Sequence, residues 1–427
     1  MNALVIFGLL AVLMLTGMPI SISLGLTVLT FLFTMTQVPL ESVALKLFTG
    51  IEKFEIMAIP FFILAGNFLT HGGVAKRMIN FATSMVGHWY GGLGLAGVMA
   101  CALFAAVSGS SPATVVAIGS ILLPAMVKAG FPNKFGAGVI STSGALGILI
   151  PPSIVMVMYS VATNTSVGAL FMAGVIPGLA LAATLGGVTW YRARKFNYPR
   201  QPKATWGGRW TSFRQSVWGL LLIVVVMGGI YTGIFTPTEA AAMSAVYAFI
   251  CAVFIYKDLG LKDVPKVLLN SANMSAMLLY IITNAVLFSF IMTNENIPQA
   301  LADWMMGHGL GVITFLLMCN VLLLLAGNFM EPSSIVLIFA PILFPVAVAL
   351  GIHPVHFGII MVVNMEVGMC HPPVGLNLYV ASGITKMGIT ELTVAVWPWL
   401  LSMLGFLVVV TYWPGLSLWF PRQLGML

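Results

Sequence analysis

The chain has 427 residues, of which 60% are hydrophobic and only 7% are Asp, Glu, Lys or Arg. Soluble proteins carry about 25% charged residues, so this composition excludes an ordinary soluble globular domain and a disordered chain. The formal net charge is +7, and seven of the basic residues lie between positions 192 and 214 without an acidic neighbour. Such a cluster is a signal of membrane topology and not of nucleic-acid binding. We therefore predict an all-α polytopic membrane protein.

Apolar runs along the chain predict ten membrane crossings, because a crossing needs about 20 apolar residues. They cover about 3–17, 19–36, 55–70, 133–163, 167–190, 216–234, 237–256, 272–293, 353–381 and 393–413. Residues 73–86 and 296–307 are amphipathic and predict helices along the membrane interface. No basic residue precedes the first run, so we expect a crossing there and not a cleaved signal peptide.

Two further apolar stretches, 91–130 and 311–351, do not fit single crossings. Small polar residues and a proline interrupt them at 108–112 and 327–334. A continuous helix of about 40 residues would be about 60 Å long, twice the thickness of the hydrocarbon core. We predict two re-entrant helical hairpins; the alternative is two pairs of ordinary crossings joined by polar turns.

The distribution of basic residues supports this topology. If each hairpin returns to the side from which it enters and the 191–215 segment is cytoplasmic, fifteen of the eighteen Lys and Arg residues lie inside. Membrane proteins carry such an excess on the cytoplasmic side. The prediction places both termini outside and makes 191–215 a basic cytoplasmic linker.

The two hairpins are followed by matching sequence, which predicts an internal repeat. Prolines and glycines recur at a constant offset: Pro124, Gly130, Gly147, Pro151 and Pro152 correspond to Pro345, Gly351, Gly368, Pro372 and Pro373. Five crossings separate the hairpins, so the repeats are inverted. We predict a first repeat over 1–190 and a second over 216–427, with the hairpins and the broken helices 133–163 and 353–381 forming a transport domain and the remainder a scaffold. Inverted repeats with discontinuous helices are typical of secondary transporters.

The chemistry of the interruptions points to ion and acid binding. Each of four prolines (Pro112, Pro152, Pro332 and Pro373) is expected to open a half-helix, because proline suits the first helical position. Free carbonyl groups at half-helix C-termini suit Na⁺, and free N–H groups at N-termini suit a carboxylate. No Lys or Arg lies at these points. A bound cation would therefore have to offset the charge of an anionic substrate.

Polar side chains at the interruptions are candidate ligands, although small hydroxyl residues also stabilise contacts between membrane helices. The first hairpin tip has Ser108, Ser110, Ser111 and Thr114, and the second has Asn328, Ser333 and Ser334. Glu331 and Glu366 are carboxyl groups at membrane depth, which are rare and usually functional; a structural role for Glu366 is equally open. A packed imidazole is the preferred interpretation of His371. The sequence contains no hydrolase or nucleotide-binding motif, so we expect no enzymatic activity.

Four motifs resemble the large membrane subunit of TRAP (tripartite ATP-independent periplasmic) transporters. They are Leu-Ala-Gly-Asn at 64–67, Ser-Gly-Ser-Ser-Pro-Ala-Thr at 108–114, Gly-Ile-Leu-Ile-Pro-Pro-Ser at 147–153 and Gly-Ile-Phe-Thr-Pro-Thr-Glu-Ala-Ala at 233–241. The resemblance implies Na⁺-coupled symport of an organic acid, commonly sialic acid or a C4-dicarboxylate, across the bacterial inner membrane, with both termini periplasmic. It implies a fold similar to elevator-type ion transporters. It also implies two partners, a small four-helix membrane subunit and a periplasmic substrate-binding protein; no fused small subunit is expected.

The resemblance further implies the ligands. Two Na⁺ sites would be formed by Ser108, Gly109, Ser110, Thr114, Thr142, Gly144 and Gly147, and by Glu331, Ser333, Gly368, Met369 and Cys370. The substrate would contact Ser110, Ser111, Pro112, Pro152, Asn328, Ser333, Ser334 and Pro373. Three alternatives stay open: a stand-alone ion-coupled anion transporter, a membrane-embedded enzyme that uses Glu331, Glu366 and His371, and a channel.

Overall fold

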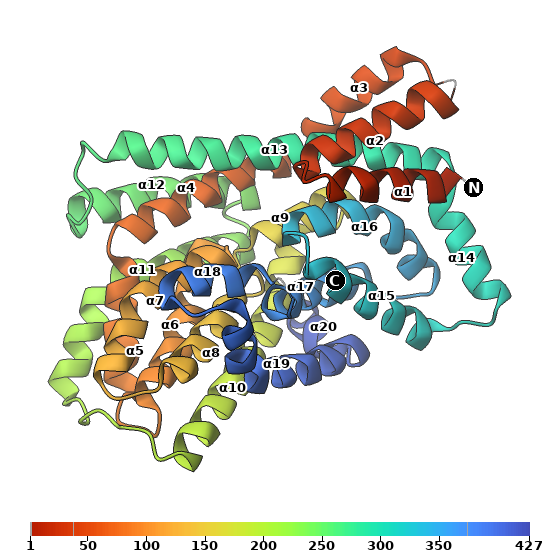
Figure 1. Ribbon diagram of the computed structural model, residues 1–427. Coiled ribbons are helices and arrows are strands. Elements are labelled where there is room, and N and C mark those ends of the chain that lie inside the picture. The colour runs from red at the N-terminus through yellow and green to blue at the C-terminus, as the bar shows by residue number, and fades with distance from the viewer. Residues whose placement is uncertain (1, 37, 374) are drawn as a thin grey trace.

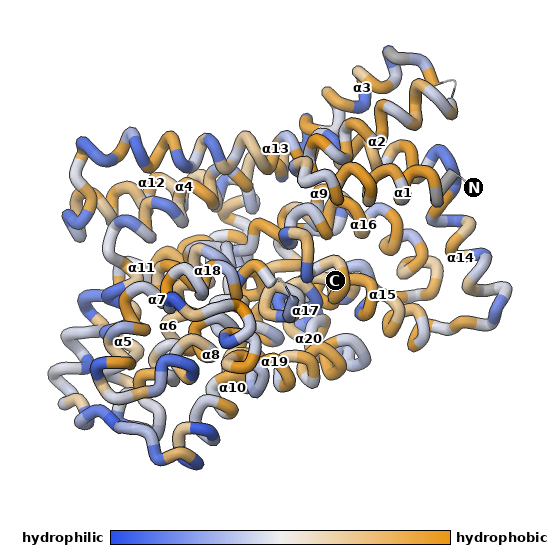
Figure 2. Tube along the Cα trace, in the orientation of Figure 1, coloured by the Kyte–Doolittle hydropathy of each residue, from blue (hydrophilic) through white to orange (hydrophobic). Residues whose placement is uncertain are grey.

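The computed structural model describes residues 2–36, 38–373 and 375–427, and all regular structure in these ranges is helical (Figure 1). Residues 1, 37 and 374, which fall within the predicted repeats, lie outside the described ranges. Eight helical segments in this part of the chain are long and apolar enough to cross a membrane. Figure 2 shows hydrophobic residues along most helices and hydrophilic residues gathered at many helix ends and connections. The prediction of an all-helical, multi-span membrane protein is confirmed.

The first half of the chain forms ten α-helices, with two short 3₁₀ segments. They are α1 (Asn2–Leu15), α2 (Ile20–Met35), α3 (Leu40–Ile51), η1 (Phe54–Met57), α4 (Ala58–His71), α5 (Val74–Val86), α6 (Gly92–Ser108), α7 (Ser111–Lys128), α8 (Asn133–Ser143), η2 (Gly144–Ile148), α9 (Ile154–Thr163) and α10 (Val167–Lys195).

The regular structure of the second half is also helical throughout its described residues. It comprises α11 (Trp206–Tyr231), α12 (Pro237–Ile250), the π-helical segment η3 (Cys251–Ile255), α13 (Val264–Asn294), α14 (Ile297–Gly307), α15 (Val312–Gly327), α16 (Pro332–Ala349), α17 (Pro354–Cys370), α18 (Leu376–Thr385), α19 (Ile389–Tyr412) and α20 (Gly415–Gln423).

Both predicted hairpins are interrupted helices. In the first, α6 ends at Ser108, Gly109 turns the chain with a φ of +59°, and α7 begins at Ser111. In the second, α15 ends at Gly327 and α16 begins at Pro332. The arms of each hairpin pack against each other. A glycine at positive φ allows such a turn without the steric cost that a Cβ atom would add.

The two broken helices are also present. Of the four prolines that we predicted to open half-helices, the two at the hairpin tips do so and the two in the broken helices do not. Pro112 and Pro332 lie in the first turns of α7 and α16, as predicted. Pro152 does not open α9, because Ser153 is the N-cap and its hydroxyl accepts from the Met156 N–H at 3.3 Å. Pro373 likewise precedes α18, which begins at Leu376. Proline disfavours the helical conformation of the residue that precedes it. Two consecutive prolines therefore lengthen the non-helical segment.

The helices differ from the sequence prediction in some of their ends and in two additional short helices. The basic segment 191–215 is mostly helical, because α10 continues to Lys195 and α11 begins at Trp206, which leaves 196–205 as the connection. Thr205 caps α11 by accepting from the Gly208 N–H at 3.1 Å. Two helices, α3 and α20, were not predicted. Both are shorter than a membrane crossing, and they pack on α13 and α10.

Packing relates the two halves of the chain. The second arm of the first hairpin, α7, packs on α18, and the second arm of the second hairpin, α16, packs on α9. Each hairpin therefore contacts the half-helix that follows the interruption of the other half. The long helix α13 and the shorter α4 and α12 lie together on one side of this arrangement (Figure 1). The pairing brings the four interruptions towards the middle of the molecule.

Candidate functional site

The tip of the first hairpin rests on the first broken helix. The Ser111 hydroxyl donates to the Gly144 carbonyl at 2.9 Å. A Cβ atom at Gly147 would lie 2.6 Å from the carbonyl group of Ser110. Only a glycine fits at position 147, because backbone atoms of the tip occupy the space that a side chain would need.

Hydroxyl groups gather around one carbonyl at this tip. The Ser108 and Thr114 hydroxyls are buried and lie 2.9 Å apart. Thr114 donates to the Ser110 carbonyl at 2.8 Å, and Ser108 does so at 3.3 Å. Three oxygens are thus held within a few ångströms by the sharp turn of the chain. Uncharged oxygens of this kind are the ligands that unwound helices offer to Na⁺.

The tip of the second hairpin rests on the second broken helix in a corresponding way. Gly327 and Gly368 meet so closely that a Cβ atom on either would lie 2.9 Å from the Cα atom of the other. The Asn328 amide lies 3.0 Å from His371 Nδ1. With its nitrogen on that side, the amide donates to the carbonyls of His371 and Pro372 at 3.0 and 3.2 Å. His371 is therefore a packed, hydrogen-bonded residue.

A carboxyl group distinguishes the second tip. The Ser334 hydroxyl, which is fully buried, donates to Glu331 Oε1 at 3.3 Å. Ser333 is buried in the same turn of α16. Glu331 is the N-cap residue of α16, although its side chain makes no capping hydrogen bond to the backbone of that helix.

Asn377 connects the two halves, and sequence reasoning missed it. This fully buried residue of α18 donates to the Ser111 hydroxyl at 2.8 Å and to the Ser141 carbonyl at 3.3 Å. The Cys370 thiol donates to the same carbonyl at 3.3 Å. An amide at membrane depth is itself a signal of function or of a specific helix contact, but the predicted ligands ended at Pro373, although the predicted broken helix continued to 381.

The remaining predicted ligands differ in where they lie. The Thr142 hydroxyl donates to the Gly138 carbonyl in α8 at 2.8 Å. Pro373 is exposed, whereas Pro152 is buried with its carbonyl beside Gly109. Met369 is buried at the end of α17. Around the first tip the structure brings together Ser108, Gly109, Ser110, Ser111, Pro112, Thr114, Gly144, Gly147 and Pro152. At the second tip Asn328 and Gly368 lie at the contact with the broken helix, and Glu331, Ser333 and Ser334 follow in the first turn of α16. The Cys370 thiol instead bonds to Ser141 of the first half.

Glu366 lies in the middle of α17 and is fully buried. In the described part of the chain, neither of its carboxyl oxygens has a hydrogen-bond partner. A buried carboxylate without a partner is costly, so such a group either holds a proton or binds a cation. Asn364, two residues earlier, is paired on its donor side, where it donates to Asn320 at 2.8 Å.

Comparison with known proteins identifies the kind of molecule to which these features belong. The family model described as "Tripartite ATP-independent periplasmic transporter, DctM component" matches residues 7–416. The chain is 78% identical to the C4-dicarboxylate TRAP transporter large permease protein DctM of Rhodobacter capsulatus, with all of both chains covered. It is 53% identical to DctM of Pseudomonas aeruginosa, with 95% of each chain covered. It is 36% identical to the sialic acid TRAP transporter large permease protein SiaM of Vibrio cholerae, with 98% and 97% covered.

The fold is similar to one solved by crystallography. The Alcanivorax borkumensis YdaH transporter superposes with a TM-score of 0.64 over 91% of this chain and 89% of that one. Sequence identity is only 16%, so this likeness concerns the fold and not the substrate.

Proposed function

The chain belongs to the DctM family, the large membrane component of tripartite ATP-independent periplasmic transporters, and from this we propose that it imports a C4-dicarboxylate across the bacterial inner membrane by Na⁺ symport. Relatives named for C4-dicarboxylates share 50–78% identity with it, and two relatives named for sialic acid share 33% and 36%. Relatives of this kind are named as transporter permeases, not as enzymes.

One observation carries the proposal: each hairpin tip is seated on an interrupted helix, and no Lys or Arg is present at either contact. A dicarboxylate that binds there needs compensation for two negative charges. Helix N-termini supply part of it. A bound cation about 4 Å away adds roughly 4 kcal/mol at an effective dielectric constant of 20, which offsets much of the cost of removing the acid from water.

The proposed Na⁺ sites are asymmetric in their ligands. The first uses hydroxyl and carbonyl oxygens of the first tip and of η2, among them Ser108, Ser110 and Thr114. The second uses the Glu331 carboxylate with Ser333 and the backbone at Gly368. The close approach of tip and break in both places supports this assignment. The substrate then lies between the first turns of α7 and α16, within reach of Ser111 and Asn328.

We assign the hairpins and the broken helices to a moving transport domain and the remaining helices to a scaffold, as in an elevator mechanism. The family's tripartite description supports a small membrane subunit and a periplasmic binding protein as partners. In this arrangement both termini face the periplasm, and the positively charged 191–215 segment faces the cytoplasm.

The test is uptake of radiolabelled succinate into proteoliposomes that contain both membrane subunits, with the binding protein added outside. We expect uptake only with an inward Na⁺ gradient and only with the binding protein. Uptake without Na⁺ would reject symport, and uptake by the isolated chain without the binding protein would favour a stand-alone transporter. Ser108→Ala, which removes one proposed Na⁺ ligand, should raise the Na⁺ concentration needed for uptake. Ser120→Ala is its matched control, because the Ser120 hydroxyl faces its own helix.

A further inference from the structure

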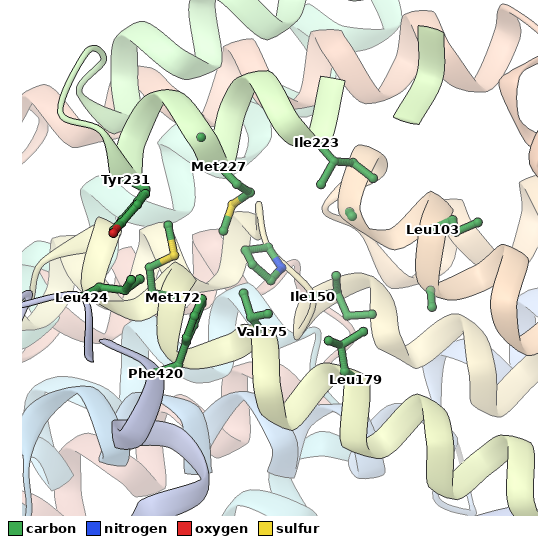
Figure 3. A pocket seen from close by; sticks show the side chains of 14 residues that line it. Leu103, Ile150, Met172, Val175, Leu179, Ile223, Met227, Tyr231, Phe420 and Leu424 are labelled. Carbon is green, nitrogen blue, oxygen red and sulfur yellow. The ribbon is translucent and has the colours of Figure 1, made fainter. Parts of the chain in front are cut away.

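A cavity of about 460 Å³ lies beside the first interruption, and its walls are almost entirely carbon (Figure 3). Four helices and the interruption contribute to it. The lining residues are Ala102, Leu103 and Ala106 of α6; Ile150 and Pro151; Met172, Val175 and Leu179 of α10; Ile223, Met227, Gly228 and Tyr231 of α11; and Phe420 and Leu424 of α20. Such a cavity offers no partner for an acid or for water, because both need hydrogen-bonding groups.

The cavity lies between the candidate site and the longer helices around it. One wall is the first arm of the first hairpin together with the interruption at Ile150 and Pro151. The facing wall is α11, whose Ile223, Met227 and Tyr231 point towards Met172 and Val175 of α10 (Figure 3). A molecule that fills this space contacts both the hairpin and α11.

Basic residues lie at the C-terminal end of α10 and in the N-terminal part of α11, which the 196–205 connection joins. Arg194 and Lys195 lie at the end of α10, Arg214 lies near the start of α11, and all three are exposed. Within the residues that the structure describes, the two ion pairs are Arg77–Asp258 and Lys134–Glu391, and neither involves this segment. Exposed basic residues next to a membrane attract anionic lipid headgroups.

One of the two distances from these residues to the cavity matches the depth of one lipid leaflet, and the other is somewhat longer. From Ile223 to Arg214 along α11 the helical rise gives about 14 Å, and from Leu179 to Arg194 along α10 it gives about 22 Å. Half of the hydrocarbon core is about 15 Å thick. A headgroup held by the basic ends therefore allows an acyl chain to reach the cavity.

We propose that this cavity is a specific site for an acyl chain of an anionic phospholipid, whose headgroup is held by the basic ends of α10 and α11. The chain fills the space between the first hairpin and α11, where a vacant apolar cavity would lose packing contacts. A lipid in this place differs from the general lipid surroundings of a membrane protein, because it contacts the interruption that carries the candidate site. The assignment does not depend on the transported substrate.

The test uses phosphatidylglycerol with a photoreactive diazirine near the end of one acyl chain, in proteoliposomes of the purified protein with any subunit that copurifies. We expect labelling of residues 172–179 and 223–231. Gly228→Phe is the diagnostic variant: a Cβ atom at Gly228 meets no atom within 4 Å, so the new ring fits into the cavity and excludes the lipid. Gly187→Phe is its control, because Gly187 lies on the exposed side of α10 with equal room.

Labelling of the two segments should fall to background in Gly228→Phe and should be unchanged in Gly187→Phe. Persistent labelling in Gly228→Phe would overturn the proposal. So would a cross-link between this cavity and the small subunit in place of lipid, since a protein helix would then be the occupant.

A second variant tests the headgroup without altering the cavity. In R194Q/K195Q/R214Q, labelling by phosphatidylglycerol should fall to that by the phosphatidylcholine analogue, since each basic residue near the surface favours an anionic lipid by about fivefold. Equal labelling by both lipids in the unmodified protein would overturn the anionic site. All three substituted residues are exposed, so loss of folding is not expected to obscure the result.

Discussion

The two hairpin sites have a common design but differ in their access to the outside of the molecule. At the first interruption, Gly147, Pro151 and Pro152 are all buried. At the second, Pro373 is exposed, and Phe329 at the neighbouring tip is 70% exposed. A repeated sequence pattern has therefore produced one closed site and one more open site in the same conformation. The difference shows that access is set by the neighbouring helices and not by the interruption itself.

The sites also differ in what holds the tip in place. The first tip is fixed by hydrogen bonds from Ser111 to Gly144 and from Asn377 to Ser111. The second depends on close contact between Gly327 and Gly368 and on the Asn328 amide. Hydrogen bonds in a buried setting specify one geometry, and their loss leaves unpaired groups. We therefore expect the first site to be the more rigid and the second to adjust on ligand binding.

The largest expected effect concerns charge. Glu331→Gln removes the carboxylate of the second site, whereas Ser108→Ala removes one hydroxyl of the first. A unit charge at about 4 Å from Na⁺ is worth up to roughly 4 kcal/mol, and one hydroxyl is worth about 1 kcal/mol. The Na⁺ concentration for half-maximal uptake should rise by about a hundredfold or more in Glu331→Gln and by about fivefold in Ser108→Ala.

Asp303→Asn is the control for the first of these variants, because it removes a carboxylate from an exposed position of α14. If the Na⁺ concentration for half-maximal uptake rose equally in Glu331→Gln and Ser108→Ala, the proposed difference in charge between the two sites would be wrong. If it rose in neither variant, both residues would be rejected as Na⁺ ligands.

The next effect concerns the glycines at the two interruptions. In Gly147→Ala the new methyl group meets the backbone of Ser110 at 2.6 Å, whereas in Gly368→Ala it meets Gly327 at 2.9 Å. Overpacking of this kind costs about 1–3 kcal/mol. We expect the initial rate of uptake to fall by about 10- to 100-fold in Gly147→Ala and by less in Gly368→Ala. Gly383→Ala has free space around it and should be neutral. A larger loss of uptake in Gly368→Ala than in Gly147→Ala would contradict our conclusion that the first site is the more closed one.

Asn377→Ala tests the hydrogen-bond network that fixes the first tip. It leaves the Ser141 carbonyl with the Cys370 thiol as its only remaining side-chain donor among the described contacts. Loss of buried hydrogen bonds costs about 1–3 kcal/mol, so the melting temperature should fall by several degrees and uptake should fall with it. Asn273→Ala, at an exposed position of α13, is the control. An unchanged melting temperature in Asn377→Ala would show that the network does not stabilise the first site.

These variants separate what local sequence predicts from what it does not. Gly109, Pro112, Gly147 and Pro332 act on the backbone within a few residues, so the positions of both hairpin tips and both broken helices could be predicted. The bond between Asn377 and Ser111 joins residues 266 positions apart. No periodicity or motif encodes such a pair. Its members could be recognised only as polar residues at membrane depth.

Helix length explains the other differences. The 12-residue α3 and the 9-residue α20 are shorter than the run of about 20 apolar residues by which a membrane crossing is recognised in a sequence. They form because α13 and α10 provide surfaces on which they pack. A different limit explains why we predicted Pro152 and Pro373 at helix starts. Proline is favoured in the first turn of a helix, but this preference does not indicate how many residues an interruption contains.

The smallest expected effect concerns a contact that, among the described residues, is found at the first broken helix and not at the second. The half-buried Lys53 donates to the Val161 carbonyl and to the Asn164 side chain at the end of α9, where a cation complements the helix dipole. At the corresponding end of α18, the contacts come from within the same turn, such as Ser382 to the Met387 carbonyl. Lys53→Met removes both hydrogen bonds, whose gain is partly offset by the cost of burying the cation, so it should loosen the first half-helix and lower the stability by about 0.5–1 kcal/mol. Lys46→Met, on the exposed side of α3, should not.

The pH dependence of the melting temperature checks this contact. Burial lowers the pKa of Lys53 from its ordinary value of 10.5, and the charge of Glu55 opposes that shift in part. Between the lowered value and 10.5 the unfolded chain binds more protons at Lys53 than the folded chain does, so this residue makes the stability rise with pH across that window. The rise should be absent in Lys53→Met and retained in Lys46→Met. Identical pH profiles in the two variants would mean that Lys53 is not held at the end of α9, and the greater rigidity of the first site would then rest on Ser111 and Asn377 alone.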